Sequence, residues 1–163
     1  MRLILYYAPS FWFKTYKKIL DEVPDSEMEE GVENRIKFEV GSAYSFPCED
    51  HSIDLLLCIN TLHHLDRPID FFNEVARSLK ERGSFVIVDF HRDTSPILIW
   101  LFNILWKSFF KGNPHAKKGF LESVRSSYTL KETQSFLGDS KLNHWHLYTR
   151  TVEMWIESRR MNV

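Results

Sequence analysis

Apolar residues are densest in two short runs near the middle of the chain, and a helical pattern lies between them. Ile53–Ile59 is almost continuously apolar, and Phe85–Asp89 has the same character. Such runs are typical of parallel strands that are buried on both faces of a sheet. Between them, Pro68 stands where a helix should begin, apolar residues recur at helical spacing, and Gly83 is expected to stop the helix. This order predicts a right-handed βαβ unit.

The N-terminal part of the chain has a less regular pattern. Leu3–Tyr7 is expected to form a short strand, and Phe11–Val23 a helix with Pro24 just past its end. Ile36–Val40 reads as a further strand that ends at a glycine. The acidic stretch Asp21–Glu33 is expected to be a solvated helix end or loop.

The C-terminal part adds a helix and a pair of strands. Thr129 and Glu132 form a capping box, which predicts a short helix that ends at Gly138. Trp145–Thr151 and Val152–Glu157 are expected to form an antiparallel pair at the edge of the sheet. With the βαβ unit, these elements predict an α/β fold: a three-layer domain over residues 1–163 with a mostly parallel sheet.

The stretch Ile97–Phe110 is the most apolar helix candidate, and its pattern leaves two interpretations open. Apolar side chains occur on all of its sides, so the helix should need burial on more than one side. It is either a core helix that packs on the sheet, or an exposed apolar face. In the second case residues 97–110 would contact another subunit, an apolar substrate or a membrane surface. No apolar stretch is long enough to cross a bilayer.

Charge is unevenly divided along a chain whose net charge is only −1. Residues 1–106 contain 11 Lys or Arg and 17 Asp or Glu, which gives −6, whereas residues 107–163 contain 10 and 5, which gives +5. The two parts are expected to complement each other within one domain. A basic surface for nucleic acid or anionic lipid is the alternative, but no run of Lys and Arg is dense enough to favour it.

The chain contains two cysteines, Cys48 and Cys58, which form no CxxC motif. Neither cysteine has a spacing to histidines or carboxylates that suits zinc, so no metal site is predicted. No signal peptide is evident at the N-terminus. A reducing, cytoplasmic location is therefore expected.

Five segments between residues 35 and 93 stand in a recognisable order. They are Gly41–Pro47, Asp50–Asp54, Asn60–Leu65, Arg77–Gly83 and Phe85–Asp89. In this order they resemble the core of class I S-adenosylmethionine-dependent methyltransferases that act on small molecules, of the type 11 kind. The resemblance implies a Rossmann-like fold, S-adenosylmethionine as cofactor and methyl transfer to a small-molecule acceptor.

The resemblance also implies which residues hold the cofactor: Gly41, Ser42, Ala43, Asn60, Thr61 and Leu62. Both segments follow predicted strands, and ligands of open parallel sheets bind beyond the carboxyl ends of the strands. Asn60 offers both donors and an acceptor near the methionine part of the cofactor. As a loop-edge position, residue 60 is expected to tolerate leucine.

Two departures from the family pattern concern the residues that bind the cofactor. The six glycines stand at 31, 41, 83, 112, 119 and 138, so no two lie within three positions, and the family's Gly-rich turn is absent. No second strand ending in an acidic residue is recognisable, and Ser42 stands where an Asp usually meets the adenine. About one N-terminal βα unit is therefore expected to be lacking, with weak cofactor binding as the consequence.

Three histidines are candidates for proton transfer, because histidine titrates near neutral pH. His63 and His64 follow one predicted strand, and His91 follows the other. In the family such a histidine pair is common without being catalytic, so a packing role is the alternative for His63 and His64. Asp89, His91 and Arg92 are expected to line the substrate side.

Three functions follow from these patterns. The first is S-adenosylmethionine-dependent methyl transfer, with little activity expected of this chain alone. The second is a non-catalytic binding module derived from a methyltransferase, or a truncated gene product. The third is a protein that binds a hydrophobic ligand or a membrane surface through residues 97–110. The fold alone cannot decide among them, since one fold hosts many functions.

Overall fold

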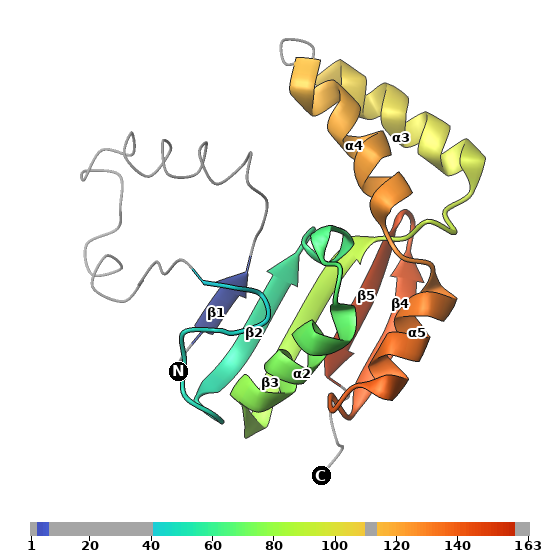
Figure 1. Cartoon of the computed structure of the whole chain (residues 1–163). Helices are drawn as coiled ribbons and strands as arrows, with labels where there is room; N and C mark the ends of the chain where they lie inside the picture. The colour runs from blue at the N-terminus through green and yellow to red at the C-terminus, as the bar shows by residue number, and fades with distance from the viewer. Residues whose placement is uncertain (1–2, 7–40, 110–113, 159–163) are drawn as a thin grey trace, which may run out of the picture.

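The computed structural model describes residues 3–6, 41–109 and 114–158, with side chains for 41–105 and 119–158, and its centre is one five-stranded sheet. The strands are β1 (Leu3–Tyr6), β2 (Ile53–Ile59), β3 (Leu79–Phe90), β4 (Trp145–Arg150) and β5 (Glu153–Ser158). Their order is β1-β2-β3-β5-β4. The first three pair in parallel, and β5 runs antiparallel to both of its neighbours. Four strands therefore point the same way, which confirms the predicted mostly parallel sheet and its final antiparallel pair (Figure 1).

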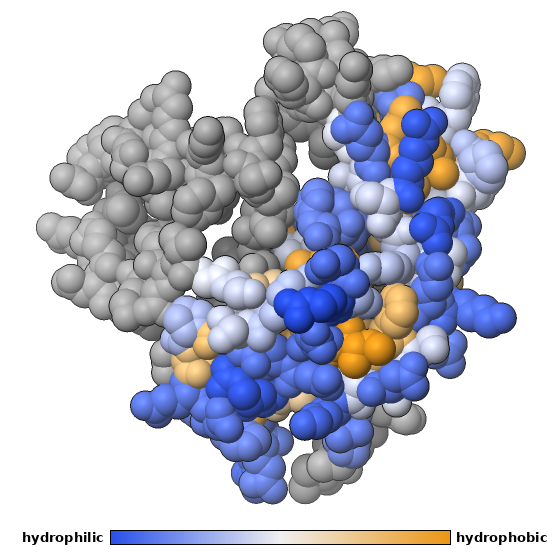
Figure 2. Space-filling view, in the orientation of Figure 1, coloured by the Kyte–Doolittle hydropathy of each residue, from blue (hydrophilic) through white to orange (hydrophobic). Residues whose placement is uncertain are grey.

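Helices lie on one face of this sheet and beyond one of its ends. They are η2 (Leu62–His64), α2 (Pro68–Ser78), α3 (Pro96–Phe109), α4 (Pro114–Ser126) and α5 (Leu130–Asp139). Figure 1 shows α2 and α5 in front of the sheet, and α3 and α4 as a hairpin that projects past the sheet. In the same orientation the surface is mostly hydrophilic, with hydrophobic groups between the helices and on the hairpin (Figure 2).

The described residues thus form a sheet with helices on one face. The third layer that the sequence predicts would need helices on the opposite face. The predicted helix Phe11–Val23, the acidic stretch Asp21–Glu33 and the predicted strand Ile36–Val40 all lie outside the described residues. The expected shortage of one βα unit concerns the same part of the chain. β1 confirms the strand predicted at Leu3–Tyr7, and it pairs with β2 from Leu3 opposite Leu55.

The main core lies between the sheet and the two covering helices. Fully buried side chains come from β2, α2, β3, α5 and β5, among them Leu56, Phe71, Phe72, Ile87, Leu137 and Ile156. Burying one such side chain contributes about 1.5–3 kcal/mol. A second, smaller cluster joins the carboxyl end of β3 to the hairpin and contains Phe90, Phe120, Val124 and Val152.

The prediction that Gly83 stops the central helix is wrong. α2 ends at Ser78, and Leu79 already has extended backbone and begins β3. The pairing of β2 with β3 shifts from Ile53 opposite Leu79 to Leu55 opposite Ser84, so β3 carries an irregular bulge in between. A Cβ atom at Gly83 would lie 2.8 Å from the carbonyl oxygen of Ile53. Gly83 therefore permits a close approach of two strands and does not cap the helix.

α5 begins as the sequence predicts. The hydroxyl of Thr129 accepts a hydrogen bond from the backbone N–H of Glu132, and the Glu132 carboxylate accepts one from the backbone N–H of Thr129. This capping box satisfies N–H groups that have no partner within the helix. The helix continues to Asp139, one residue past the predicted end at Gly138.

Arg77 fastens the loop before β2 to α2. Its guanidinium donates two hydrogen bonds to Glu74, at 2.8 and 2.6 Å, and one to Asp50 at 2.5 Å. It also donates to the backbone carbonyl of Cys48, and the Glu74 carboxylate accepts the backbone N–H of Phe46. These bonds raise the pKa of Arg77 and lower that of Glu74, chiefly through the contact between the two. The loop is thereby held in place over α2.

Candidate functional site at the carboxyl ends of β2 and β3

The carboxyl ends of β2 and β3 lie side by side because the two strands are parallel neighbours. The residue after β2 is Asn60, whose backbone N–H donates to the carbonyl of Val88 in β3 at 2.8 Å. The residue after β3 is His91, so both predicted segments reach the same edge of the sheet. This edge is where open parallel sheets bind their ligands.

Asn60 has a backbone conformation that few residue types adopt. Its φ is 50°, in the left-handed region, and its side-chain oxygen Oδ1 is buried without a hydrogen-bond partner. Asparagine tolerates this region better than other residues with a Cβ atom, whereas leucine would be strained there. The expectation that residue 60 tolerates leucine therefore does not agree with the structure. Glycine is the replacement that removes the side chain and keeps this backbone.

His63 and Asp89 form a buried pair that the sequence does not reveal. The ring nitrogen Nδ1 of His63 lies 2.6 Å from Oδ1 of Asp89, and the backbone N–H of His63 donates to Oδ2 at 2.9 Å. Asp89 is fully buried, and it also accepts the backbone N–H of Phe90. Since a carboxylate accepts hydrogen bonds, Asp89 selects the tautomer of His63 with the proton on Nδ1. The other nitrogen, Nε2, is then an acceptor, and it is buried without a partner.

The two other candidate histidines, His64 and His91, have different environments. The His64 ring is exposed and lies 3.9 Å from the His63 ring, centroid to centroid. Burial of part of the ring lowers the pKa of His64, and the neighbouring His63 lowers it further. His91 is buried, and neither of its ring nitrogens makes a hydrogen bond of normal geometry. Burial lowers the pKa of His91, and the charge of Asp93 and the backbone of Thr151 offset part of that effect.

Unpartnered buried polar atoms are concentrated at this edge. Among the described residues, six buried side-chain nitrogen or oxygen atoms lack a partner. Four of the six belong to Asn60, His63 and His91, and the others belong to Asn103 and Trp155. Leaving such an atom unpaired costs about 1–3 kcal/mol, so folded proteins rarely accumulate them in one place. A bound polar ligand would satisfy these atoms.

The segment Gly41–Ala43 makes its described contacts with its own loop and with the main core. A Cβ atom on Gly41 would come within 2.9 Å of the Pro47 ring, so glycine is needed for this packing. The hydroxyl of Ser42 accepts the backbone N–H of Tyr44 at 3.1 Å, and Ala43 is buried in the core. The backbone of this segment, more than its side chains, is therefore available to a ligand.

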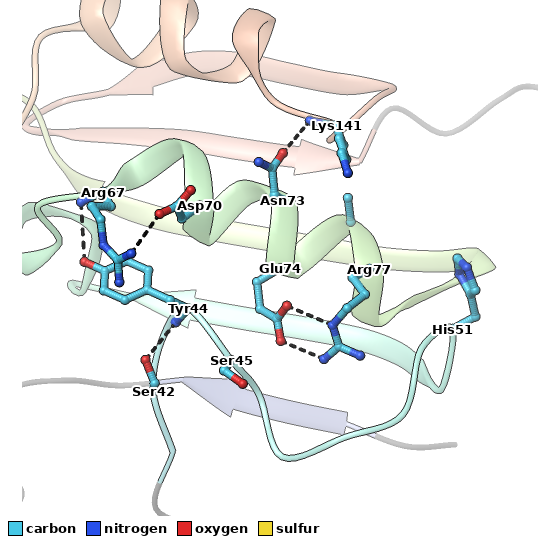
Figure 3. A pocket seen from close by; sticks show the side chains of 11 residues that line it. Ser42, Tyr44, Ser45, His51, Arg67, Asp70, Asn73, Glu74, Arg77 and Lys141 are labelled. Atoms are coloured by element: carbon cyan, nitrogen blue, oxygen red, sulfur yellow. Dashed lines mark hydrogen bonds and ion pairs between the residues drawn. The ribbon is translucent and has the colours of Figure 1, made fainter.

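Tyr44 connects the Gly41–Ala43 segment to the residues that follow β2. Its hydroxyl donates to the carboxylate of Asp66 at 2.5 Å and accepts the backbone N–H of the same residue. The guanidinium of Arg67 lies over the Tyr44 ring, 4.1 Å from its centroid (Figure 3). Through Tyr44, which the sequence patterns did not single out, the loop that follows Ala43 thus contacts Asp66 and Arg67, just past the predicted Asn60–Leu65 segment.

Thr61 and Leu62, predicted to contact the cofactor, have buried side chains. The Thr61 hydroxyl donates to the carbonyl of Ile59 at 3.0 Å, and Leu62 is fully buried in the main core. Like Ala43, they can offer a ligand their backbone groups only. Among the six predicted residues, Asn60 is the one whose side chain has a buried polar atom without a partner.

A separate groove of about 780 Å³ lies between α2 and the loop before β2 (Figure 3). Its lining includes Ser42, Arg67, Asp70, Glu74, Arg77 and Lys141. Several of these charges already pair with one another, as in Arg67 with Asp70 at 3.1 Å and Arg77 with Glu74. Apart from Ser42, none of the predicted site residues lines this groove. It is therefore distinct from the strand-end site.

Arg92 and Asp93 hold α5 against the carboxyl end of β3. The guanidinium of Arg92 donates to both carboxylate oxygens of Glu132, at 2.9 and 2.8 Å. Asp93 accepts the backbone N–H of Leu130 at the start of α5. Arg92, predicted to line the substrate side, is thus engaged with a helix terminus.

The described residues contain no group of three or more His, Cys, Asp or Glu side chains placed to hold a metal ion. Cys48 and Cys58 are both free thiols. Burial raises the pKa of the Cys58 thiol far above its usual value, so it remains protonated in the core. Within the described residues no helix is long and apolar enough to cross a membrane.

Comparison with known proteins gives a consistent set of relatives. A family described as "Methyltransferase domain" matches residues 12–87. The chain is 27% identical over 141 residues to the uncharacterised methyltransferase YcgJ of Bacillus subtilis, which covers 86% of this chain and 53% of YcgJ. It is 34% identical over 68 residues to ajmaline N-methyltransferase of Rauvolfia serpentina, covering 41% of this chain and 23% of that enzyme.

Solved structures show the same fold. A putative S-adenosylmethionine-dependent methyltransferase from Methanococcus maripaludis matches 99% of this chain and 67% of its own, with a TM-score of 0.61 and 16% identity. The crystal structure of YcgJ matches 90% of this chain and 53% of its own, with a TM-score of 0.50 and 26% identity. These matches confirm the predicted Rossmann-like α/β fold. The matched region spans about half the length of YcgJ and less than a quarter of the plant enzyme.

Proposed function

Since this chain belongs to the class I S-adenosylmethionine-dependent methyltransferases, we propose that it serves methyl transfer from S-adenosylmethionine to a small-molecule acceptor. The observation that carries this proposal is the gathering of unpartnered polar atoms of Asn60, His63 and His91 at the carboxyl ends of β2 and β3. These atoms lie where the fold binds its ligands.

The residues at this edge fit the cofactor. The orphaned Oδ1 of Asn60 can accept a hydrogen bond from a charged amino group, and the backbone of Asn60–Leu62 borders the same place. Gly41–Ala43 precedes Tyr44, which bonds Asp66 a few residues past Leu62, and we propose that the backbone of Gly41–Ala43 contacts the adenine ring. We therefore assign the cofactor to Gly41–Ala43 and Asn60–Leu62. When bound there, S-adenosylmethionine supplies an electrophilic methyl group.

His63 is the best-placed of the three candidate bases. Asp89 accepts its Nδ1–H, fixes the orientation of the ring and leaves Nε2 free to accept a proton. An acceptor that carries an O–H or N–H group would give up that proton to Nε2 of His63, and Asp89 would stabilise the resulting imidazolium. His91 is the alternative base, because it is also buried and unpartnered. His64 is exposed and has no carboxylate to orient it, so we assign it no proton-transfer role.

We propose that this chain by itself binds the cofactor weakly. No two of its glycines lie within three positions. Ser42 provides no charge for the adenine because its hydroxyl is neutral, and the hydroxyl oxygen already accepts the backbone N–H of Tyr44. Each unpaired polar group of a buried ligand costs about 1–3 kcal/mol, and about 1.4 kcal/mol is a factor of ten in affinity. Several such losses weaken binding by roughly three powers of ten, with correspondingly little methyl transfer.

A non-catalytic binding module is the second candidate function. Two observations favour it: the Ser42 hydroxyl already bonds Tyr44, and the glycines are widely spaced. Both should weaken contacts to the adenine and methionine ends of S-adenosylmethionine. Such a module would retain the polar edge and bind a nucleoside-like ligand without transferring a methyl group. Within the same proposal, we place residues 1–163 in one functional unit and in the reducing cytoplasm, in keeping with two free thiols.

Calorimetric titration of S-adenosylmethionine into the purified chain tests this proposal. We expect a dissociation constant well above the low-micromolar range, and Asn60→Gly should weaken binding at least tenfold further. The matched control is Asn73→Ala, which removes an amide from the separate groove, where Asn73 bonds the backbone of Lys141.

Equal affinity of wild type and Asn60→Gly, with a loss in Asn73→Ala, would move the ligand to the groove. A low-micromolar dissociation constant for S-adenosylmethionine would contradict the proposed weak binding. Binding without methylation of any acceptor would favour the non-catalytic module.

A further inference from the structure

Exposed hydrophobic side chains are concentrated on one helix. Six large hydrophobic residues are exposed among the described ones, and five of them lie on α3: Ile97, Trp100, Leu101, Ile104 and Leu105. They are spaced three and four residues apart, so they form one stripe along the helix. We call this set the α3 stripe. Scattered exposed hydrophobic residues are ordinary, whereas a contiguous stripe marks a contact surface.

The side of α3 opposite the stripe already packs against the rest of the protein. The stripe is therefore an outer face of the helix. Leu98, Ile99 and Phe102 pack against the second cluster, and the rings of Phe102 and Phe120 stack with centroids 6.2 Å apart. α3 is therefore apolar on two faces, as its sequence suggested. One face is covered by α4 and the end of the sheet, and the other is exposed.

The charge of this region points to the kind of surface that it meets. From Thr94 to Leu121 the sequence contains four lysines and no Asp or Glu. The lysines are Lys107, Lys111, Lys117 and Lys118. Lys107 belongs to α3, Lys117 and Lys118 belong to α4, and Lys111 lies between them in the sequence. An anionic surface attracts such a cluster, whereas a second copy of the same hairpin would bring like charges together.

Shape and composition point the same way. The hairpin projects beyond the sheet, so α3 can lie flat on an extended surface without obstruction by α2 or α5 (Figure 1). With 14 residues, α3 is about 21 Å long, which suits a helix lying in a membrane interface and not one crossing the bilayer. Trp100, 61% exposed, is a residue type enriched at the boundary between lipid and water.

From these observations we propose that the α3 stripe and the lysines that follow it dock the protein on an anionic lipid bilayer. The stripe enters the acyl boundary, and the lysines meet anionic headgroups. The hairpin stands beyond the carboxyl ends of β2 and β3, and α4 contacts η2, so docking brings the strand-end site close to the membrane. The proposal does not depend on cofactor binding.

Flotation with large unilamellar vesicles tests the docking directly, with the full chain and no cofactor. Vesicles of phosphatidylcholine alone are compared with vesicles containing about one third phosphatidylglycerol. We expect at least tenfold stronger partitioning to the anionic vesicles, and a steep loss when salt is raised. Trp100→Gln combined with Ile104→Gln should reduce partitioning at least tenfold without changing circular dichroism, because both side chains are exposed.

Two charge variants separate specific docking from general attraction. Lys107→Gln with Lys117→Gln, in α3 and α4, should weaken binding to anionic vesicles several-fold, whereas the matched pair Lys131→Gln with Lys141→Gln, outside the hairpin, should not. Equal partitioning by the Trp100 and Ile104 double variant and the wild type would overturn the proposal. Absence of vesicle binding, together with a dimer in sedimentation that the same double variant abolishes, would also overturn it and make a second copy the occupant.

Discussion

At the scale of single residues, the site contains buried side chains whose polar atoms do not all have hydrogen-bond partners. Asp89 satisfies one nitrogen of His63, but Nε2 of His63 and both nitrogens of His91 remain unpaired. For His91 the cost of burying a charge lowers its pKa, so the neutral ring is the form that the fold accommodates. This gives stability a dependence on pH.

The predicted dependence follows from the difference between folded and unfolded states. In the unfolded chain His91 titrates at its ordinary pKa of 6.5, and in the folded chain the pKa is lower. Between the two values the unfolded state binds more protons, so the free energy of unfolding falls as the pH is lowered. The contribution of His91 is fully present above pH 6.5 and is lost as the pH falls toward the folded-state pKa. His64 adds an effect of the same sign.

Urea unfolding between pH 5.5 and 8 measures this dependence, above the range in which Glu74 and Asp66 titrate. We expect His91→Leu to make the free energy of unfolding depend less on pH. Stability at pH 8 should remain nearly unchanged, because the ring nitrogens have no strong hydrogen-bond partner to lose. A curve for His91→Leu as steep as that of the wild type would show that His91 is not the group responsible.

At the scale of elements, a few contacts decide how each segment is placed. The start of α2 at Pro68, the capping box of α5 and the buried strands β2 and β3 could all be predicted, because each depends on neighbouring residues. The end of α2 could not, because the residue after it, Leu79, is extended and pairs with Ile53, 26 positions earlier. Local patterns contain no information about such pairings.

Arg77 is the contact that most clearly joins two elements. Its fork meets both oxygens of Glu74, and the same guanidinium reaches Asp50 and the carbonyl of Cys48. Lysine keeps the charge but cannot reproduce the planar fork. We expect Arg77→Lys to lower the free energy of unfolding by about 1–2 kcal/mol, since the buried Glu74 loses part of its hydrogen bonding.

The matched control is Arg67→Lys, because Arg67, just before α2, pairs with exposed Asp70, and a lysine can also place its charge over the Tyr44 ring. Exposed pairs contribute little, so this change should stay within about 0.5 kcal/mol. Denaturant unfolding of both variants gives the comparison. If the two substitutions had equal effects, the Arg77 network would be no more than a surface ion pair.

At the scale of the whole molecule, the fold was predictable and much of the site geometry was not. The order of five short segments between residues 35 and 93 was enough to indicate the family and the α/β architecture. The His63–Asp89 pair joins residues 26 positions apart, and it forms only because β2 and β3 align in register. The left-handed backbone of Asn60 and the bridging role of Tyr44 likewise arise from packing between segments.

The α3–α4 hairpin shows the same limit. The sequence left two interpretations of residues 97–110, a core helix or an exposed face, and the structure contains both. Periodicity could not separate them because α3 is apolar on two opposite sides. Only the packing of Phe102 on Phe120 shows which side is covered.

The central claim is that the carboxyl ends of β2 and β3 form the ligand site of a methyltransferase domain. Backbone amide spectra of the isotope-labelled chain, recorded while S-adenosylmethionine is added to millimolar concentration, test it most directly. We predict saturable shifts at Asn60, Thr61, His63 and the Gly41–Ala43 segment, with half-saturation well above the low-micromolar range. Shifts confined to the groove around Glu74 and Lys141, or none at all, would contradict the claim.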